Sequence, residues 1–208
     1  MRKILLLAII FVSVALVAFS PFGGETYKTL EIGQEAPMLD YKMKSIADVT
    51  SSLADLKGEN GTIVMFSCNT CPFVIAWEDR YPELNKLAKE KGMNLILINS
   101  NEAKRGGDDS MSAMKKHAKD KGYADVAYMV DENSALANAF GGKSTPHVFL
   151  FDKNWKLAYE GAIDDNYKDA KAVETHYLKD AMMNLAEGKK IDPNNTKALG
   201  CSIKRVKS

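Results

Sequence analysis

Short runs of apolar residues alternate with amphipathic segments through most of the chain. A short apolar run that is rich in β-branched residues is typical of a buried strand, and alternating apolar and polar positions are typical of a half-buried one. These patterns predict strands at 38–43, 62–66, 93–98, 126–130, 147–151 and 156–161.

Between these strands, apolar residues recur at helical spacing. The longest such segment runs from Phe73 to Leu87, and Pro82 should kink it because proline lacks an N–H and clashes with the preceding turn. Other helices are predicted at 110–121, 133–140 and 173–186, with a turn or short helix at 51–57. Strands alternating with helices predict an α/β fold with helices on both faces of a central sheet. The last two strands are joined by a tight turn and must be antiparallel, so we expect a mixed β-sheet.

The N-terminus has a different pattern. Arg2 and Lys3 precede an apolar run at 4–19, which is the pattern of a secretory signal. The sequence predicts a signal peptide or N-terminal membrane anchor at 1–24, a linker at 25–33 and one domain at 34–208. Small residues near Ser20 favour cleavage, whereas Pro21 opposes it, so both fates stay open. The domain is expected to be exported, to a periplasmic or other extracytoplasmic location.

The composition is that of an ordinary globular protein, with 46% hydrophobic and 26% charged residues and a net charge of +1. Nucleic-acid binding would need a clustered basic excess, which is not seen, so no nucleic-acid partner is predicted. Membrane contact is expected through the N-terminal segment alone. Of the 3 cysteines, two lie close together and Cys201 lies far away, an arrangement that suggests redox chemistry more than a structural disulfide framework.

Cys68 and Cys71 form a C-x-x-C motif directly after the apolar run at 62–66. We expect a helix to start at about Asn69, which would place Cys68 at a helix N-terminus, where backbone N–H groups favour a thiolate. Cys68 would then attack a partner disulfide and Cys71 would resolve the mixed disulfide. No cofactor is predicted for this chemistry.

A C-x-x-C motif can also be half of a zinc site. Zinc would need a second ligand pair at similar spacing. The chain offers Cys201 and 3 histidines, none of them paired in sequence, so no metal site is predicted.

The motif, the following Pro82 and the Thr145-Pro146 dipeptide before the last two strands together resemble the thioredoxin superfamily. This resemblance implies a thioredoxin-like fold in which Pro146 is cis and packs beside Cys68. It also implies that Thr145 binds the extended backbone of the partner protein.

A closer resemblance is to the peroxiredoxin-like thioredoxin-family proteins related to the AhpC/TSA redoxin domains. It is carried by the segments 33–37, 67–74, 99–101, 109–110, 145–152 and 200–204. The chain departs from these families in three ways. Gly61 and Met65 replace the proline and hydroxyl residue of the peroxidatic motif, the strand at 62–66 lacks the buried acid of thioredoxins, and Ser67 replaces the usual tryptophan.

Two further residues keep open interpretations. His147 either lies near the dithiol, as a thiolate partner or a third ligand for Cu(I), or packs on the far face of its strand. Cys201 either pairs transiently with the dithiol or another chain, or is an inert thiol that anchors the tail.

The leading hypothesis is a thiol–disulfide oxidoreductase that exchanges disulfides with exported proteins and is served by an upstream electron donor. The alternatives are a copper-binding module that uses Cys68, Cys71 and His147, and a thiol peroxidase.

Overall fold

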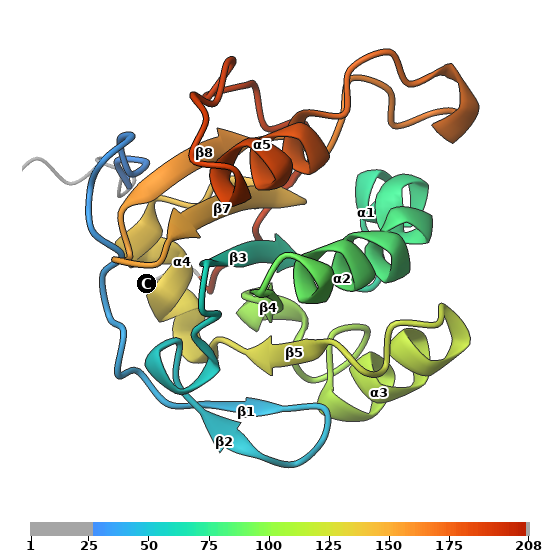
Figure 1. Ribbon diagram of the computed structural model, residues 1–208. Helices are drawn as coiled ribbons and strands as arrows, with labels where there is room; N and C mark the ends of the chain where they lie inside the picture. Colours follow the sequence, from blue (N-terminus) through green and yellow to red (C-terminus); the bar gives the residue numbers. More distant parts are fainter. Residues whose placement is uncertain (1–26, 207–208) are drawn as a thin grey trace, which may run out of the picture.

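A seven-stranded sheet forms the centre of the computed structural model, which describes residues 27–206 (Figure 1). Across the sheet, the strands are β2 (Thr50–Ser51), β1 (Met43–Ser45), β5 (Ala127–Val130), β4 (Met93–Asn99), β3 (Gly61–Ser67), β7 (His147–Asp152) and β8 (Leu157–Gly161). The predicted signal peptide or anchor at 1–24 lies outside the described residues. Within residues 27–206, no helix is long and apolar enough to cross a membrane.

β3 lies in the middle of the sheet, and all of its residues are buried. It pairs parallel with β4 and antiparallel with β7, which continues antiparallel into β8. A strand buried on both faces needs apolar residues at successive positions, which explains the unbroken run from Ile63 to Phe66. The predicted α/β fold with a mixed sheet is confirmed.

The first predicted strand, at 38–43, is wrong. Met38 has a φ of 56°, and the Tyr41 N–H donates a hydrogen bond to the Met38 carbonyl at 3.0 Å, so the chain turns there. β1 begins only at Met43 and pairs antiparallel with β5. A segment in which apolar and polar residues alternate can therefore form a turn when its backbone hydrogen bonds are local.

Helices cover both faces of the sheet, as predicted. They are α1 (Pro72–Trp77), α2 (Tyr81–Glu90), α3 (Met111–Asp120), α4 (Ala135–Phe140) and α5 (Tyr177–Ala186), with 3-10 turns at Ala54–Leu56, Glu78–Arg80, Glu102–Lys104, Glu132–Ser134 and Ala170–Ala172. Ile63 and Met65 face a core shared with α1, α2, α3 and α5. Val64 and Phe66 face the opposite core, which contains α4.

The long helix expected over 73–87 is divided into α1 and α2 by the turn at Glu78–Arg80. Pro82 lies in the first turn of α2, where its missing N–H needs no acceptor. The expected kink is therefore a break in the helix just before the proline. Within this break, the buried Glu78 carboxylate lies 2.6 Å from both His117 Nε2 and Lys121 Nζ.

A second, small sheet was not expected. It pairs β6 (Ser144–Thr145) antiparallel with β9 (Cys201–Ser202), which brings the C-terminal segment back to the edge of the main fold. The backbone next to β9 is bonded too, because the Ala103 N–H donates to the Lys204 carbonyl at 2.9 Å. β9 is two residues long and has no apolar pattern that would reveal a strand.

Candidate functional site

The two cysteines of the C-x-x-C motif lie in the loop between β3 and α1. The Asn69 N–H donates to Asp109 Oδ1 at 2.9 Å, and Asn69 Nδ2 donates to the Asp108 carbonyl at 2.7 Å. α1 begins only at Pro72, and the extended residue Cys71 caps it. The predicted helix start at about Asn69 is wrong, because the backbone is still extended at Cys71, with φ −71° and ψ 124°.

Thr145 contacts both sulfur atoms of the motif. Its hydroxyl lies 3.2 Å from Cys68 Sγ, and its carbonyl oxygen lies 3.1 Å from Cys71 Sγ, whose thiol form donates to it. The peptide bond between Thr145 and Pro146 is cis, as the resemblance to thioredoxins implied. On its other side Thr145 is the register partner of Cys201 in β9. Thr145 is thus the common neighbour of three cysteines. We call Cys68, Cys71 and Cys201 the thiol cluster.

Cys68 and Cys71 shift each other's pKa in opposite directions. Donation from the Cys68 thiol lowers the pKa of Cys71, and the Cys201 thiol and the Val74 backbone N–H add to this effect, while burial opposes it. The same bond to Cys71, together with burial, raises the pKa of Cys68. The sequence predicts Cys68 as the attacking thiol, whereas these pKa directions favour the thiolate of Cys71.

A buried carboxylate, Asp109, holds the loop of the motif in place. Its Oδ1 accepts from Asn99 Nδ2 at 2.8 Å, in addition to the Asn69 N–H, and its Oδ2 accepts from Asn101 Nδ2 at 3.1 Å. The negative charge of Asp109 also raises the pKa of Cys68. The strand before the motif lacks the buried acid of thioredoxins. In the structure, a buried acid, Asp109, comes instead from the loop before α3.

Sequence reasoning assigned no role to Asp109, Asn99 or Asn101. A signal was present, because three polar residues, Asn99, Ser100 and Asn101, follow directly after the apolar run at 93–98. That end of β4 lies beside the end of β3, where the motif begins. The position of Asp109, in contrast, depends on how the intervening loop folds back.

His147 lies away from the thiol cluster. Its ring packs 4.4 Å from the ring of Phe149, in the core on the opposite face of the sheet from Cys68 and Cys71. His147 Nδ1 accepts from the Lys143 N–H at 3.2 Å, and Nε2 is bonded to Glu160 Oε1. The hypothesis that His147 supports the dithiol is wrong, and its packing on the far face is confirmed.

The copper site proposed from Cys68, Cys71 and His147 is therefore not formed. Within the described part of the chain, no group of three histidine, cysteine or acidic side chains is arranged to hold a metal ion. The Glu160 carboxylate that binds His147 also accepts from Asn195 Nδ2 at 2.7 Å, so its second oxygen is bonded as well.

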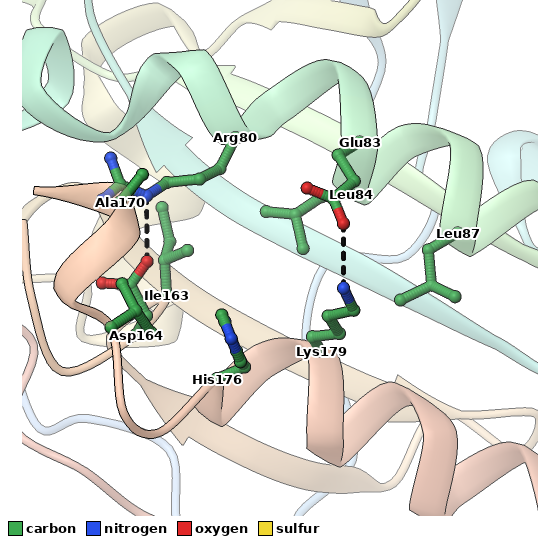
Figure 2. Close-up of a pocket in the computed structure, with 10 residues that line it drawn as sticks. Arg80, Glu83, Leu84, Leu87, Ile163, Asp164, Ala170, His176 and Lys179 are labelled. Atoms are coloured by element: carbon green, nitrogen blue, oxygen red, sulfur yellow. Dashed lines mark hydrogen bonds and ion pairs between the residues drawn. The ribbon is translucent and has the colours of Figure 1, made fainter.

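Two cavities differ in what their walls offer. One, of about 150 Å³, opens onto all three sulfurs of the thiol cluster, with Lys104 and Lys204 at its rim. The other, of about 130 Å³, lies between α2 and α5. Figure 2 shows its charged side chains bonded to one another, with Arg80 Nε 3.0 Å from Asp164 Oδ2 and Lys179 Nζ 2.8 Å from Glu83 Oε1. The reactive groups face the first cavity.

Comparisons with known proteins agree with this geometry. The AhpC/TSA family model matches residues 32–160. No curated protein matches the sequence significantly. An uncharacterized conserved protein from Geobacillus kaustophilus is 32% identical, with a TM-score of 0.79 over 86% of this chain and 94% of that one. A hypothetical protein from Sinorhizobium meliloti is 26% identical, with a TM-score of 0.78 over 87% and 98%.

The thioredoxin domain of a thiol-disulfide oxidoreductase from Bacteroides vulgatus is 17% identical, with a TM-score of 0.54 over 64% of this chain and 90% of that domain. At this identity the likeness shows the fold alone. Together with the family match and the cis proline beside two cysteines, it establishes that this chain is a member of the AhpC/TSA family with a thioredoxin-like fold.

Proposed function

We propose that this protein is a thiol–disulfide oxidoreductase in which Cys71 attacks and Cys68 resolves. The observation that carries this proposal is the pair of free cysteines after β3, whose sulfurs both contact Thr145 next to the cis Pro146. The thiolate is the nucleophile in disulfide exchange, so the sulfur with the lowered pKa is the one that reacts first at neutral pH.

The proposed reaction moves two electrons from the dithiol to the partner. The Cys71 thiolate attacks one sulfur of a partner disulfide, a mixed disulfide forms, and the second partner sulfur leaves as a thiolate. Cys68 then loses its proton to solvent and attacks Cys71 Sγ. The mixed bond breaks, the Cys68–Cys71 disulfide forms, and the partner's first sulfur leaves as a thiolate. An upstream dithiol donor returns the two electrons.

Both cysteines are buried, and both line the cavity beside β6. Thr145, whose hydroxyl and carbonyl contact the two sulfurs, keeps Cys68 near Cys71. A resolving thiol needs contact with the mixed disulfide but not with bulk solvent.

The proposed partners are exported proteins with disulfides that need reduction. Thr145 would pair with the extended backbone of such a partner, and the same backbone edge is now paired with β9. A partner chain would take the place of β9, which is two residues long, while Ile203 and Lys204 keep the following segment bonded to Lys143 and Asn101. Lys104 and Lys204 at the rim favour acidic or polar residues next to the partner's cysteine.

The site of action in this proposal is outside the cytoplasm. Support comes from Arg2 and Lys3 before the apolar run at 4–19, a pattern that directs export. The protein would be periplasmic or otherwise extracytoplasmic, and attached to the membrane through that segment if it is retained. An alkaline phosphatase fusion after residue 33 should be active, and a fusion without residues 1–24 should be inactive.

The test of the reaction is the reduction of insulin disulfides with dithiothreitol as the electron source. The protein should accelerate insulin precipitation over dithiothreitol alone. The matched control is the same protein with its thiols blocked by N-ethylmaleimide, which should give the background rate. An unblocked protein that also gives the background rate would contradict the proposed function.

Peroxide reduction finds no support from the residues around either cysteine. The positions seven and three before Cys68 are Gly61 and Met65, and those before Cys71 are Val64 and Cys68. Neither set supplies the proline and hydroxyl residue of a peroxidatic motif. Labelling with dimedone after peroxide treatment should therefore detect no rapid sulfenate formation at Cys68 or Cys71.

A further inference from the structure

Cys201 belongs to the same arrangement of sulfurs as the C-x-x-C pair. The register of β6 and β9 places Cys201 directly opposite Thr145, whose hydroxyl and carbonyl contact the sulfurs of Cys68 and Cys71. Cys201 also packs against the core cluster that contains Cys68 and Cys71. All three cysteines line one cavity, and all three are free thiols.

Cys201 is held at this place by the chain on both sides of it. Gly200 lies so close to Thr145 that a Cβ at this position would be 2.4 Å from the Thr145 carbonyl oxygen, so only glycine allows the approach. After the strand, Ile203 is buried, and the Lys204 N–H donates to Asn101 Oδ1 at 2.8 Å. The position of Cys201 opposite Thr145 is therefore a built feature of the fold rather than the chance position of a tail.

We propose that Cys201 is a third redox thiol of this site, which takes the disulfide over from Cys68 to form a Cys71–Cys201 bond. The proposal rests on the proposed function, because the Cys68–Cys71 disulfide that it uses is the product of partner reduction. Cys201 loses its proton to solvent and its thiolate attacks Cys71 Sγ. The bond between Cys68 and Cys71 breaks as the new bond forms, and Cys68 leaves as a thiolate and takes up a proton. No electrons are gained or lost, so no further oxidant or reductant is needed.

This transfer moves the disulfide toward solvent. Cys68 and Cys71 are both buried, whereas Cys201 is partly exposed. An electron donor can therefore attack Cys201 more easily than either sulfur of the Cys68–Cys71 bond. Burial and the neighbouring Cys71 sulfur raise the pKa of Cys201, and oxidation of Cys71 removes the second of these causes. Cys201 thus ionises more readily at the stage when its thiolate is needed.

The two disulfides can be told apart by digestion with trypsin. Cleavage after Lys57 and Arg80 leaves Cys68 and Cys71 together in one peptide, 58–80, and cleavage after Lys197 and Lys204 leaves Cys201 in another, 198–204. A Cys68–Cys71 bond lies within one peptide, whereas any bond to Cys201 joins the two. The wild-type protein is equilibrated in glutathione buffers of increasing potential, quenched in acid, blocked with N-ethylmaleimide and digested without reduction.

The expected result is a linked peptide pair in the monomeric wild-type protein, which accumulates as the buffer becomes more oxidising. Cys68→Ser should retain the linked pair, and Cys71→Ser should lose it. The inference is overturned by a wild-type protein without the linked pair, or by a pair that survives Cys71→Ser and disappears in Cys68→Ser. A further test mixes ¹⁵N-labelled protein with unlabelled protein. A linked peptide pair that joins a labelled and an unlabelled chain would also overturn the inference, which requires a bond within one chain.

The outcomes separate this inference from the proposed function. Insulin reduction without the linked pair removes the third redox thiol and leaves the exchange reaction standing. A linked pair without insulin reduction removes the proposed function, while it supports the Cys71–Cys201 bond, because the glutathione buffer supplies the oxidation in that experiment.

Discussion

The residues on either side of Pro146, Thr145 and His147, belong to two clusters that differ in what they can do. On one side, the thiol cluster lines a cavity, and the sulfurs of Cys68 and Cys71 contact Thr145. On the other side, His147 and Glu160 are buried and fully engaged, because each bonding atom of the ring and the carboxylate has a protein partner.

The difference between these clusters shows which polar groups are available for chemistry. A closed set of hydrogen bonds stabilises the fold and leaves nothing for a substrate. The thiol cluster instead contains one sulfur with a lowered pKa and two neighbouring thiols that can replace each other as its partner. The comparison predicts that substitutions in one cluster change reactivity and that substitutions in the other change stability.

Cys71→Ser should produce the largest effect on reactivity. We expect insulin reduction to fall by roughly 10³-fold or more, because the attacking sulfur is lost. The free energy of unfolding should change by no more than about 1 kcal/mol, because serine is close to cysteine in shape. Insulin precipitation and urea denaturation measure the two quantities. Substantial activity in this variant would end the distinction between the clusters.

Glu160→Ala should have the opposite signature. It leaves His147 Nε2 and Asn195 Nδ2 without an acceptor, which costs about 2–4 kcal/mol in the free energy of unfolding. Insulin reduction per folded molecule should stay within about twofold of the wild-type rate, since this carboxylate lies on the far side of the sheet from the sulfurs. Glu160→Gln is the milder control, because its amide oxygen still accepts one bond.

Asp109→Asn should alter both properties to a smaller degree. One carboxylate oxygen becomes an amide NH₂ that faces other donors, which costs about 1–3 kcal/mol in stability. The negative charge of Asp109 raises the pKa of Cys68, so its removal should lower that pKa. The pH profile of iodoacetamide alkylation of Cys68, measured in a Cys71→Ser, Cys201→Ser background, should shift to lower pH. A purely structural role for Asp109 would leave the profile unmoved.

Thr145→Val should give the smallest change. The variant loses the hydroxyl that lies 3.2 Å from Cys68 Sγ and that lowers the pKa of this thiol, so the pKa of Cys68 should rise further. The alkylation profile of Cys68 in the same background should shift to higher pH, while Thr145→Ser keeps the wild-type profile. The two variants differ by the hydroxyl, and equal profiles would show that this contact does not tune Cys68.

Much of this fold could be predicted from the sequence because its central strands are buried on both faces. The apolar run at 62–66 is correctly predicted as a buried strand, which ends directly before the motif at Cys68. The strand at 38–43 was misplaced because the turn at Met38 is set by local backbone bonds that leave the alternating pattern intact.

The errors in the site have a common physical cause. The motif loop was predicted as helix because Asp109, which accepts the Asn69 N–H in that loop, lies 40 residues further along the chain and gives no local signal. β9 was missed because its pairing with β6 joins Ser202 to Ser144 and Cys201 to Thr145 across a long sequence separation. Local pattern shows which residues are apolar and where a motif stands, but not which distant group completes its hydrogen bonds.

The most direct test of the central claim is to determine which cysteine forms the mixed disulfide. Cys68→Ser and Cys71→Ser are each combined with Cys201→Ser, so that no second thiol can release the partner. Both reduced variants are then mixed with oxidised insulin at neutral pH, and the adducts are identified by mass spectrometry. The Cys68→Ser, Cys201→Ser variant should accumulate an adduct through Cys71, and the Cys71→Ser, Cys201→Ser variant should form little. Rapid accumulation through Cys68 in the second variant, with none through Cys71 in the first, would contradict the account.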